Sequence, residues 1–134
     1  MDKSLYLEKN ISQQPAIDLL RSMGYTYISP EDCEAQRGSR YHVLLKDILR
    51  GQLRRLNRYA FAGAENEFCA ANIERAMEDL DEPLTDGLVR TSEKIYDALL
   101  LGKSYPETVG EGKTLSFNLK YIDWEHPENN LFHV

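Results

Sequence analysis

The sequence has few of the features that mark membrane proteins, secreted proteins or proteins stabilised by a bound metal. Its longest uninterrupted apolar runs, such as Ala98–Leu101, are four residues long, far short of the roughly 20 residues that span a bilayer. Residues Met1–Ser4 lack the basic and then apolar order of a secretory signal. We therefore expect a cytoplasmic protein that does not associate with a membrane.

Motifs for metal binding and covalent chemistry are also scarce. The two cysteines, Cys33 and Cys69, fit a reducing compartment, and the three histidines are scattered without a zinc-binding spacing. The segment Gly110–Lys113 lacks the first glycine and the following serine or threonine of a phosphate-binding loop. No local arrangement of serine, histidine and aspartate indicates a nucleophilic enzyme.

What the sequence does contain is ordinary in amount but uneven in charge. With 134 residues, it is one domain or part of one, and 42% of it is apolar and 28% charged. The net charge is −6, yet residues 37–58 hold seven basic residues and one acid, and residues 65–86 hold eight acids and one arginine. This asymmetry indicates either a face for a polyanion or protein partner, or two ordinary solvated helix faces.

The first two thirds of the chain are predicted to be mostly helical. Ser12, Pro15 and Gly24 are placed to cap, open and end a first helix. A short strand follows at Tyr25–Ile28, and residues 31–39 are polar and irregular. Three further helices are expected over residues 40–57, 65–80 and 91–102, with a small-residue connection at 60–64. The helix expected over residues 65–80 has these inward-facing residues: Phe68, Ile73, Ala76, Met77 and Leu80.

The C-terminal part is predicted to be β-structure. Residues 103–109 are extended, Gly110–Gly112 form a turn, and residues 114–121 alternate apolar and polar side chains as a half-buried strand does. Another apolar run begins at Leu131. We expect these strands to belong to a mixed sheet that needs further strands, so that residues 1–134 are the N-terminal part of a larger α/β domain and look α+β by themselves.

The helix expected over residues 40–57 carries an apolar stripe on one side and basic residues on the other. Lys46, Arg50, Arg54 and Arg58 recur every fourth residue, and Arg55 lies beside them. Lysine and arginine at this spacing can neutralise a nucleic-acid backbone without reading its sequence, which makes these five candidate DNA-binding residues. The alternative is a solubilising face, and no helix-turn-helix pattern or interleaved aromatic residue adds support to DNA binding.

Two carboxylates and one histidine are candidates for chemistry, each with an ordinary structural alternative. Asp123, beside Trp124 at a strand end, could bind a metal, but such a residue more often caps a turn. Glu8 could orient a metal-bound water or be a solvated residue ahead of the first helix. His42 is interpreted as structural.

Short sequence phrases lie in a definite order along the chain. They are Glu8, Ile11–Ile17, Met23–Tyr25, Arg40, Val43–Leu45, Leu53–Asn57, Tyr121–Trp124, Pro127–Asn130 and Phe132. Together they resemble the opening of the restriction (R) subunit of type I restriction-modification enzymes, over essentially the whole chain. One departure is Gln13, where the family often has a second glutamate.

The resemblance implies a Mg²⁺-dependent nuclease domain of the Pro-Asp…Glu-x-Lys kind, followed in the parent protein by ATP-driven translocase domains. Its partners would be DNA and the methylation and specificity subunits. The family's catalytic Asp and Glu-x-Lys strands lie downstream of the stretch matching Asn129-Asn130, so we expect them beyond Val134. Glu8 matches the family's early glutamate and is the one candidate catalytic residue. We expect residues 1–134 to bind neither a metal nor ATP and to have no nuclease activity.

Three functions follow from these observations. The first is the N-terminal part of a type I site-specific deoxyribonuclease, whose parent subunit cleaves unmodified foreign DNA after ATP-driven translocation. The second is a non-catalytic module that binds protein or DNA through the basic helix 40–58. The third is a free-standing metal-dependent hydrolase that uses Glu8 and Asp123.

Overall fold

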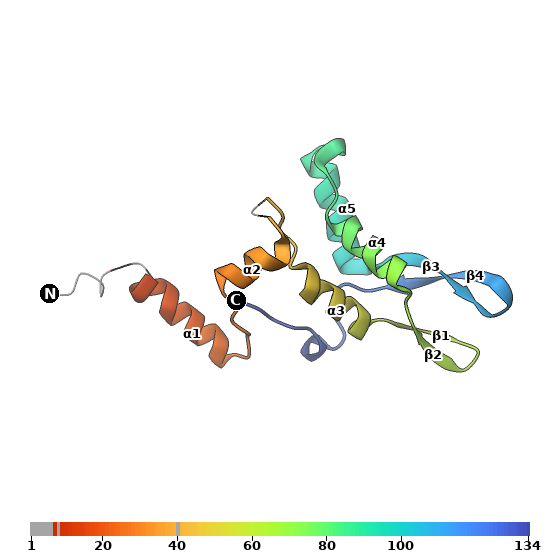
Figure 1. The fold of residues 1–134 in the computed structure, drawn as a ribbon, viewed down its shortest axis with the longest axis horizontal. Helices are drawn as coiled ribbons and strands as arrows, with labels where there is room; N and C mark the ends of the chain where they lie inside the picture. Colours follow the sequence, from red (N-terminus) through yellow and green to blue (C-terminus); the bar gives the residue numbers. More distant parts are fainter. Residues whose placement is uncertain (1–6, 8, 40) are drawn as a thin grey trace.

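The computed structural model describes residues 7, 9–39 and 41–134. Helix α1 lies at one end of an elongated molecule and two β-hairpins lie at the other (Figure 1). None of the described helices is long and apolar enough to cross a membrane. The elements follow in this order: η2 (Lys9–Gln13), α1 (Gln14–Ser22), α2 (Pro30–Arg37), α3 (Lys46–Leu56), β1 (Arg58–Phe61), β2 (Ala64–Glu67), α4 (Ala70–Leu80), η3 (Leu84–Asp86), α5 (Leu88–Leu101), β3 (Lys103–Val109), η4 (Gly110–Gly112), β4 (Lys113–Leu119) and η5 (Pro127–Asn129).

The core lies where α3, α4 and the hairpin β3–β4 meet. Leu53 of α3, Ile73 of α4 and Leu119 of β4 are fully buried. Apolar residues at helical spacing in α4 place one side of that helix against the other two elements. Four of the five residues predicted to face inward are buried, and the fifth is partly buried, in this order: Phe68, Ile73, Ala76, Met77 and Leu80.

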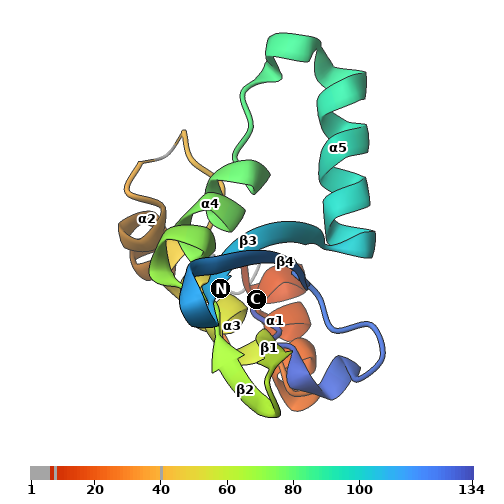
Figure 2. The same ribbon diagram turned by 90° about the vertical axis from the view of Figure 1, so that its right-hand side faces the viewer.

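The predicted C-terminal hairpin is confirmed. Strands β3 and β4 pair antiparallel from Lys103↔Leu119 to Val109↔Lys113. Helix α4 packs against this hairpin, and Figure 2 shows β3 and β4 beside α4. The mixture of helices and small antiparallel sheets is the predicted α+β appearance.

A second hairpin, β1–β2, replaces the predicted small-residue connection and the start of the third helix. Ala62 and Gly63 both have positive φ at its turn (51° and 78°). Tyr59 of β1 stacks on Phe117 of β4, with ring centroids 4.4 Å apart, and meets Phe68 edge-on at 5.4 Å. These aromatic contacts favour an extended chain here, so α4 begins at Ala70 rather than residue 65.

The other helix boundaries also differ from the prediction. Helix α3 begins at Lys46, not at residue 40, and Arg58 lies in β1. Residues 31–39 are mostly helical, because the hydroxyl of Ser29 accepts a hydrogen bond from the Asp32 amide (3.1 Å) and Pro30 opens helix α2. These two signals were present in the sequence and were missed.

The first and fourth helices begin elsewhere than expected. Ser12 lies within the π-helical turn η2, and the residue at the N-cap of α1 is Gln13, whose side chain forms no capping bond. Helix α5 begins at Leu88, and Thr91 is buried within it. Its predicted end at Gly102 is confirmed.

The two short extended segments predicted at Tyr25–Ile28 and after Leu131 lie side by side. They form one parallel bridge, Thr26↔His133. The Thr26 amide donates to the Phe132 carbonyl (2.8 Å), and the Val134 amide donates to the Thr26 carbonyl (2.9 Å). This pairing brings the C-terminal segment back to α1 and α2.

Candidate functional site

The candidate catalytic residue, Glu8, lies outside the described residues, so its role stays a prediction. The nearby Gln13, which stands where the resembling family often has a glutamate, ends the turn η2 and is exposed. Its side chain is neutral and supplies no negative charge to a metal.

The five basic residues predicted to bind DNA do not form one row in the structure. Arg58 lies on β1 and forms a salt bridge (3.1 Å) with its cross-strand partner Glu67. Arg55, in the last turn of α3, donates a hydrogen bond to the backbone carbonyl of Asn129 in the C-terminal loop. The side chains thus separate toward different parts of the molecule.

The other three basic residues, Lys46, Arg50 and Arg54, lie near the acidic helix α4. Arg50 donates to Glu74 (Nε to Oε1, 2.5 Å) and to Asp47 (Nη1 to Oδ1, 3.1 Å). The hydrogen bond from Arg50, together with the charges of Arg54 and Lys46, lowers the pKa of Glu74. Such exposed ion pairs contribute little to stability, but they reduce the positive field that DNA would meet on this side of α3.

Asp123 has the turn-capping role that the sequence favoured. The residue is 3% exposed. It accepts hydrogen bonds from the side-chain amide of Asn129 (3.1 Å) and the backbone amide of His126 (3.0 Å), and lies 3.2 Å from the Lys120 ammonium. These contacts, the Asn129 bond foremost, lower the pKa of Asp123 to about 2.

The arrangement around Asp123 leaves no open coordination site for a metal. Each of its two oxygens already faces a donor, and the side chain is closed to solvent. Across residues 7, 9–39 and 41–134, no three His, Cys, Asp or Glu side chains are placed to hold a metal ion together. His42, interpreted as structural, lies 3.9 Å from Asp81.

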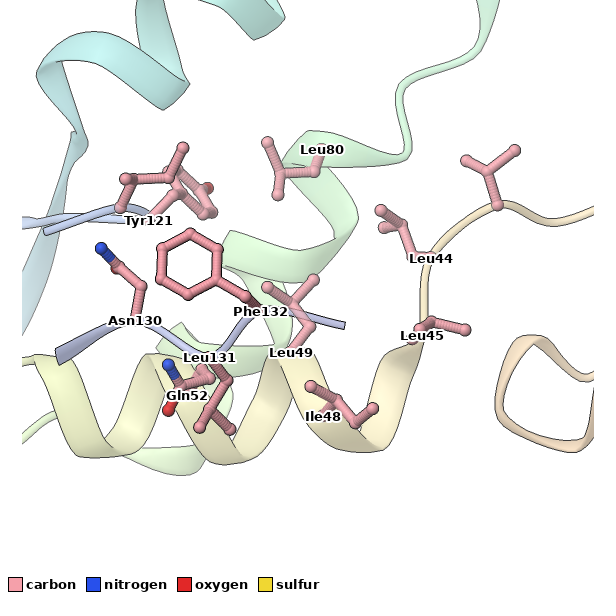
Figure 3. Close-up of a pocket in the computed structure, with 12 residues that line it drawn as sticks. Leu44, Leu45, Ile48, Leu49, Gln52, Leu80, Tyr121, Asn130, Leu131 and Phe132 are labelled. Carbon is pink, nitrogen blue, oxygen red and sulfur yellow. The ribbon is translucent and has the colours of Figure 1, made fainter. Parts of the chain in front are cut away.

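A groove of about 400 Å³ lies between the start of α3, the end of α4 and the C-terminal segment (Figure 3). Leu49, Leu80 and Phe132 face into it, and Gln52 and Asn130 supply amide groups. The described residues that line it include no carboxylate, cysteine or histidine, so the groove can accept apolar side chains, and Tyr121 is a titratable group in its lining. Sequence patterns could not reveal it, because its walls come from segments far apart in the chain.

The comparisons with known proteins bear on the whole chain rather than on one site. A family model described as "Type I restriction enzyme R protein N terminus" matches residues 5–134. No curated protein and no solved structure matches the chain.

Proposed function

Because the chain belongs to the family of type I restriction enzyme R protein N termini, we propose that it forms the N-terminal part of the nuclease domain of such an R subunit. The parent protein would be a type I site-specific deoxyribonuclease that cleaves unmodified foreign DNA in the cytoplasm after ATP-driven translocation. Its partners would be DNA and the methylation and specificity subunits. The single observation that carries this proposal is the family match across residues 5–134.

In this proposal residues 1–134 act as a structural shoulder, that is, as helices and a first hairpin that support the catalytic strands. In nucleases of this kind a bound Mg²⁺ activates water and stabilises charge on the scissile phosphate. The described residues do not fit such a centre, because the carboxylate of Asp123 is occupied by Asn129, His126 and Lys120. We therefore assign the Mg²⁺ and ATP sites to other parts of the R subunit.

The shoulder role has a structural basis in the core. Helix α4 packs on α3 and on β3, and the loop after β4 leads the chain back to Thr26, where His133 pairs with it in parallel. Parallel sheets are buried on both faces in α/β proteins, whereas Thr26 is exposed and His133 is half-buried here, so this pair is left uncovered. The helical layer thus presents two extended segments on which a nuclease sheet can build.

Cleavage assays of two samples test the proposal. The R subunit that contains this sequence, assembled with its methylation and specificity subunits, should cut unmodified DNA when Mg²⁺ and ATP are present. The 134-residue chain by itself should show no Mg²⁺-dependent cleavage of the same DNA. Robust turnover by the chain alone would contradict the shoulder role, and failure of the complete assembly to cut DNA would contradict the nuclease assignment.

The alternative of a separate interaction module using the basic helix has less support. Arg50 and Arg58 are held in ion pairs with Glu74 and Glu67. A surface that recruited an anionic partner through these residues would have to compete with both carboxylates.

A further inference from the structure

A polar pocket of about 370 Å³ lies between the last turn of α3 and the loop that follows β4. In Figure 1 this loop, with the short helix η5, runs beneath α3. The pocket is lined by Arg55, Leu56, Lys120, Asp123, His126 and Asn129. It is separate from the apolar groove, and the sequence singled out Arg55 and Asp123 but not their meeting in one pocket.

The acid in this pocket is closed off from any ligand. Asp123 is 3% exposed, and its oxygens accept from Asn129 and His126 and lie beside Lys120. Its negative charge is therefore balanced by the ammonium of Lys120, which keeps further N–H donors for the open space, so that Arg55 supplies the net positive charge of the lining. The carboxylate shapes the loop and orients Lys120, rather than facing the open space.

The accessible polar side chains of the lining can donate hydrogen bonds. Within the described part of the chain, Arg55 has no carboxylate partner, and its hydrogen bond goes to the backbone carbonyl of Asn129. The side-chain amide nitrogen of Gln52 also lies 3.5 Å from that carbonyl, so two side chains of α3 contact the loop. The side chain of Lys120 is 43% exposed and that of His126 is 64% exposed.

Other acidic residues lie at the rim of the pocket and lower the net positive charge around it. Glu128 lies 3.5 Å from the Nδ1 atom of His126 and is 72% exposed, and Glu125 is an exposed residue of the same loop. Neither lines the pocket. Charge at exposed positions is strongly screened, so these acids weaken the pocket's attraction for anions without closing it.

We propose that this pocket binds a phosphate group, and that its source is the sugar–phosphate backbone of DNA. A guanidinium and an ammonium that converge on one space form strong charge-assisted hydrogen bonds to phosphate oxygens. Contacts of this kind position a protein on DNA and carry no sequence information. The DNA source rests on the proposed function, whereas the phosphate chemistry rests on the pocket alone.

The test uses the 134-residue chain, a short DNA duplex of arbitrary sequence, and inorganic phosphate. Arg55→Gln is the main variant, and Arg54→Gln is its matched control, because Arg54 loses the same charge one residue away, on the side of α3 near Glu74. Lys120→Gln is paired with Asp123→Asn, so that no buried charge is left without a partner. Circular dichroism and thermal unfolding confirm that each variant folds.

We expect duplex binding to weaken on the order of threefold to tenfold in Arg55→Gln and in the paired variant, and the slope of log affinity against log salt to fall by roughly one. Arg54→Gln should stay within about twofold of the original affinity by the same reasoning. Glu128→Gln, which removes the rim charge, should strengthen binding. In NMR titrations, the duplex should shift the backbone amides of residues 123–129.

The proposal fails if Arg54→Gln weakens duplex binding as much as Arg55→Gln does. The basic residues of α3 would then attract DNA in general, without a contact localised at the pocket. It also fails if the duplex leaves the amides of residues 123–129 unmoved. Shifts with inorganic phosphate but none with the duplex would refute DNA as the source. None of these results depends on cleavage by the complete assembly, so the pocket and the proposed nuclease function can fail separately.

Discussion

At the scale of single residues, two buried polar side chains hold the segment after β4 in place. Asn57 is 4% exposed and forms two hydrogen bonds with the backbone of Lys120, one as donor and one as acceptor, both 2.8 Å long. It also donates to the Leu53 carbonyl (2.9 Å). The side-chain amide of Asn57 thus forms the two hydrogen bonds that a neighbouring strand would form at this edge of the sheet. It also joins the end of α3 to the loop that follows β4.

Removing this amide should be costly. Asn57→Ala leaves the partly buried amide and carbonyl of Lys120 without their partner, and a buried polar group left unpaired costs about 1–3 kcal/mol. We expect the free energy of unfolding, measured with urea, to fall by about 2–4 kcal/mol. Asn66→Ala is the control, because the side chain of Asn66 donates to the nearby Ala64 carbonyl at an exposed turn. Equal losses in both variants would show that the Asn57 side chain does not anchor this segment.

Asp123 should make stability depend on pH in the acid range. Its folded-state pKa of about 2 lies below the value of about 3.9 for an unfolded aspartate, so the ionised group stabilises the fold. The contribution is complete above about pH 4 and is lost as the pH falls through about 2.

The variant Asp123→Asn tests this dependence. It should be less stable than the original chain at neutral pH, and the difference should shrink as the pH falls from about 4 toward 2. Urea unfolding at a series of pH values measures the difference. A gap that stays constant over this range would show that the Asp123 carboxylate does not titrate with folding.

At the scale of elements, the connection from α5 to β3 depends on one glycine. Gly102 has φ of +74° and ψ of −171°, a backbone conformation open almost only to glycine. A Cβ atom there would lie 2.4 Å from the Leu119 carbonyl oxygen and 2.9 Å from the Asn118 side chain. The turn therefore lets α5 end directly against the last residue of β4.

Gly102→Ala should destabilise the fold by at least about 2 kcal/mol, from backbone strain and the close contact with Leu119. Gly38→Ala is the matched control, since Gly38 also has positive φ (75°) but no atom lies within 4 Å of an added Cβ. The control should cost about 1 kcal/mol. Thermal unfolding measures the loss of stability in each variant. Similar losses in the two variants would mean that the chain relieves the close contact with Leu119 at no cost in folding free energy.

At the scale of the whole molecule, the charge asymmetry of the sequence is largely balanced in space. The basic residues of α3 lie against the acids of α4, with Arg50 bound to Glu74. A sequence with separate basic and acidic segments thus folds into neighbouring helices of opposite charge. Arg55, which has no carboxylate partner among the described residues, faces the C-terminal loop instead.

The molecule is also uneven in burial. Helix α1 has no buried residue, whereas α4 has four, and α1 extends away from the core in Figure 1. Helices with few buried contacts open at low free energy, because helix stability comes mainly from packing.

Amide hydrogen exchange should reveal this difference. The amides of α1 should exchange at least about a hundredfold faster than those of α4, after correction for sequence effects. The amides of α4 serve as the internal control, being centred on the fully buried Ile73. Equal protection in the two helices would show that α1 unfolds together with the core.

Much of the fold and part of the site could be predicted from the sequence. The apolar spacing of α4, the alternation in β4 and the helix end at Gly102 are confirmed. The turn at Asp123 is confirmed as well. Each of these signals depends on residues a few positions apart, because helix and strand periods and turn chemistry are local properties.

The sequence by itself therefore determined the core helices, the C-terminal hairpin and the family. Only the tertiary structure decided that residues 58–67 form a hairpin held by Tyr59 on Phe117, that Glu74 takes up Arg50, and that Arg55 meets the loop at Asn129. Those outcomes join residues far apart in the chain. They follow from which surfaces pack together, and no local pattern of charge or polarity encodes that.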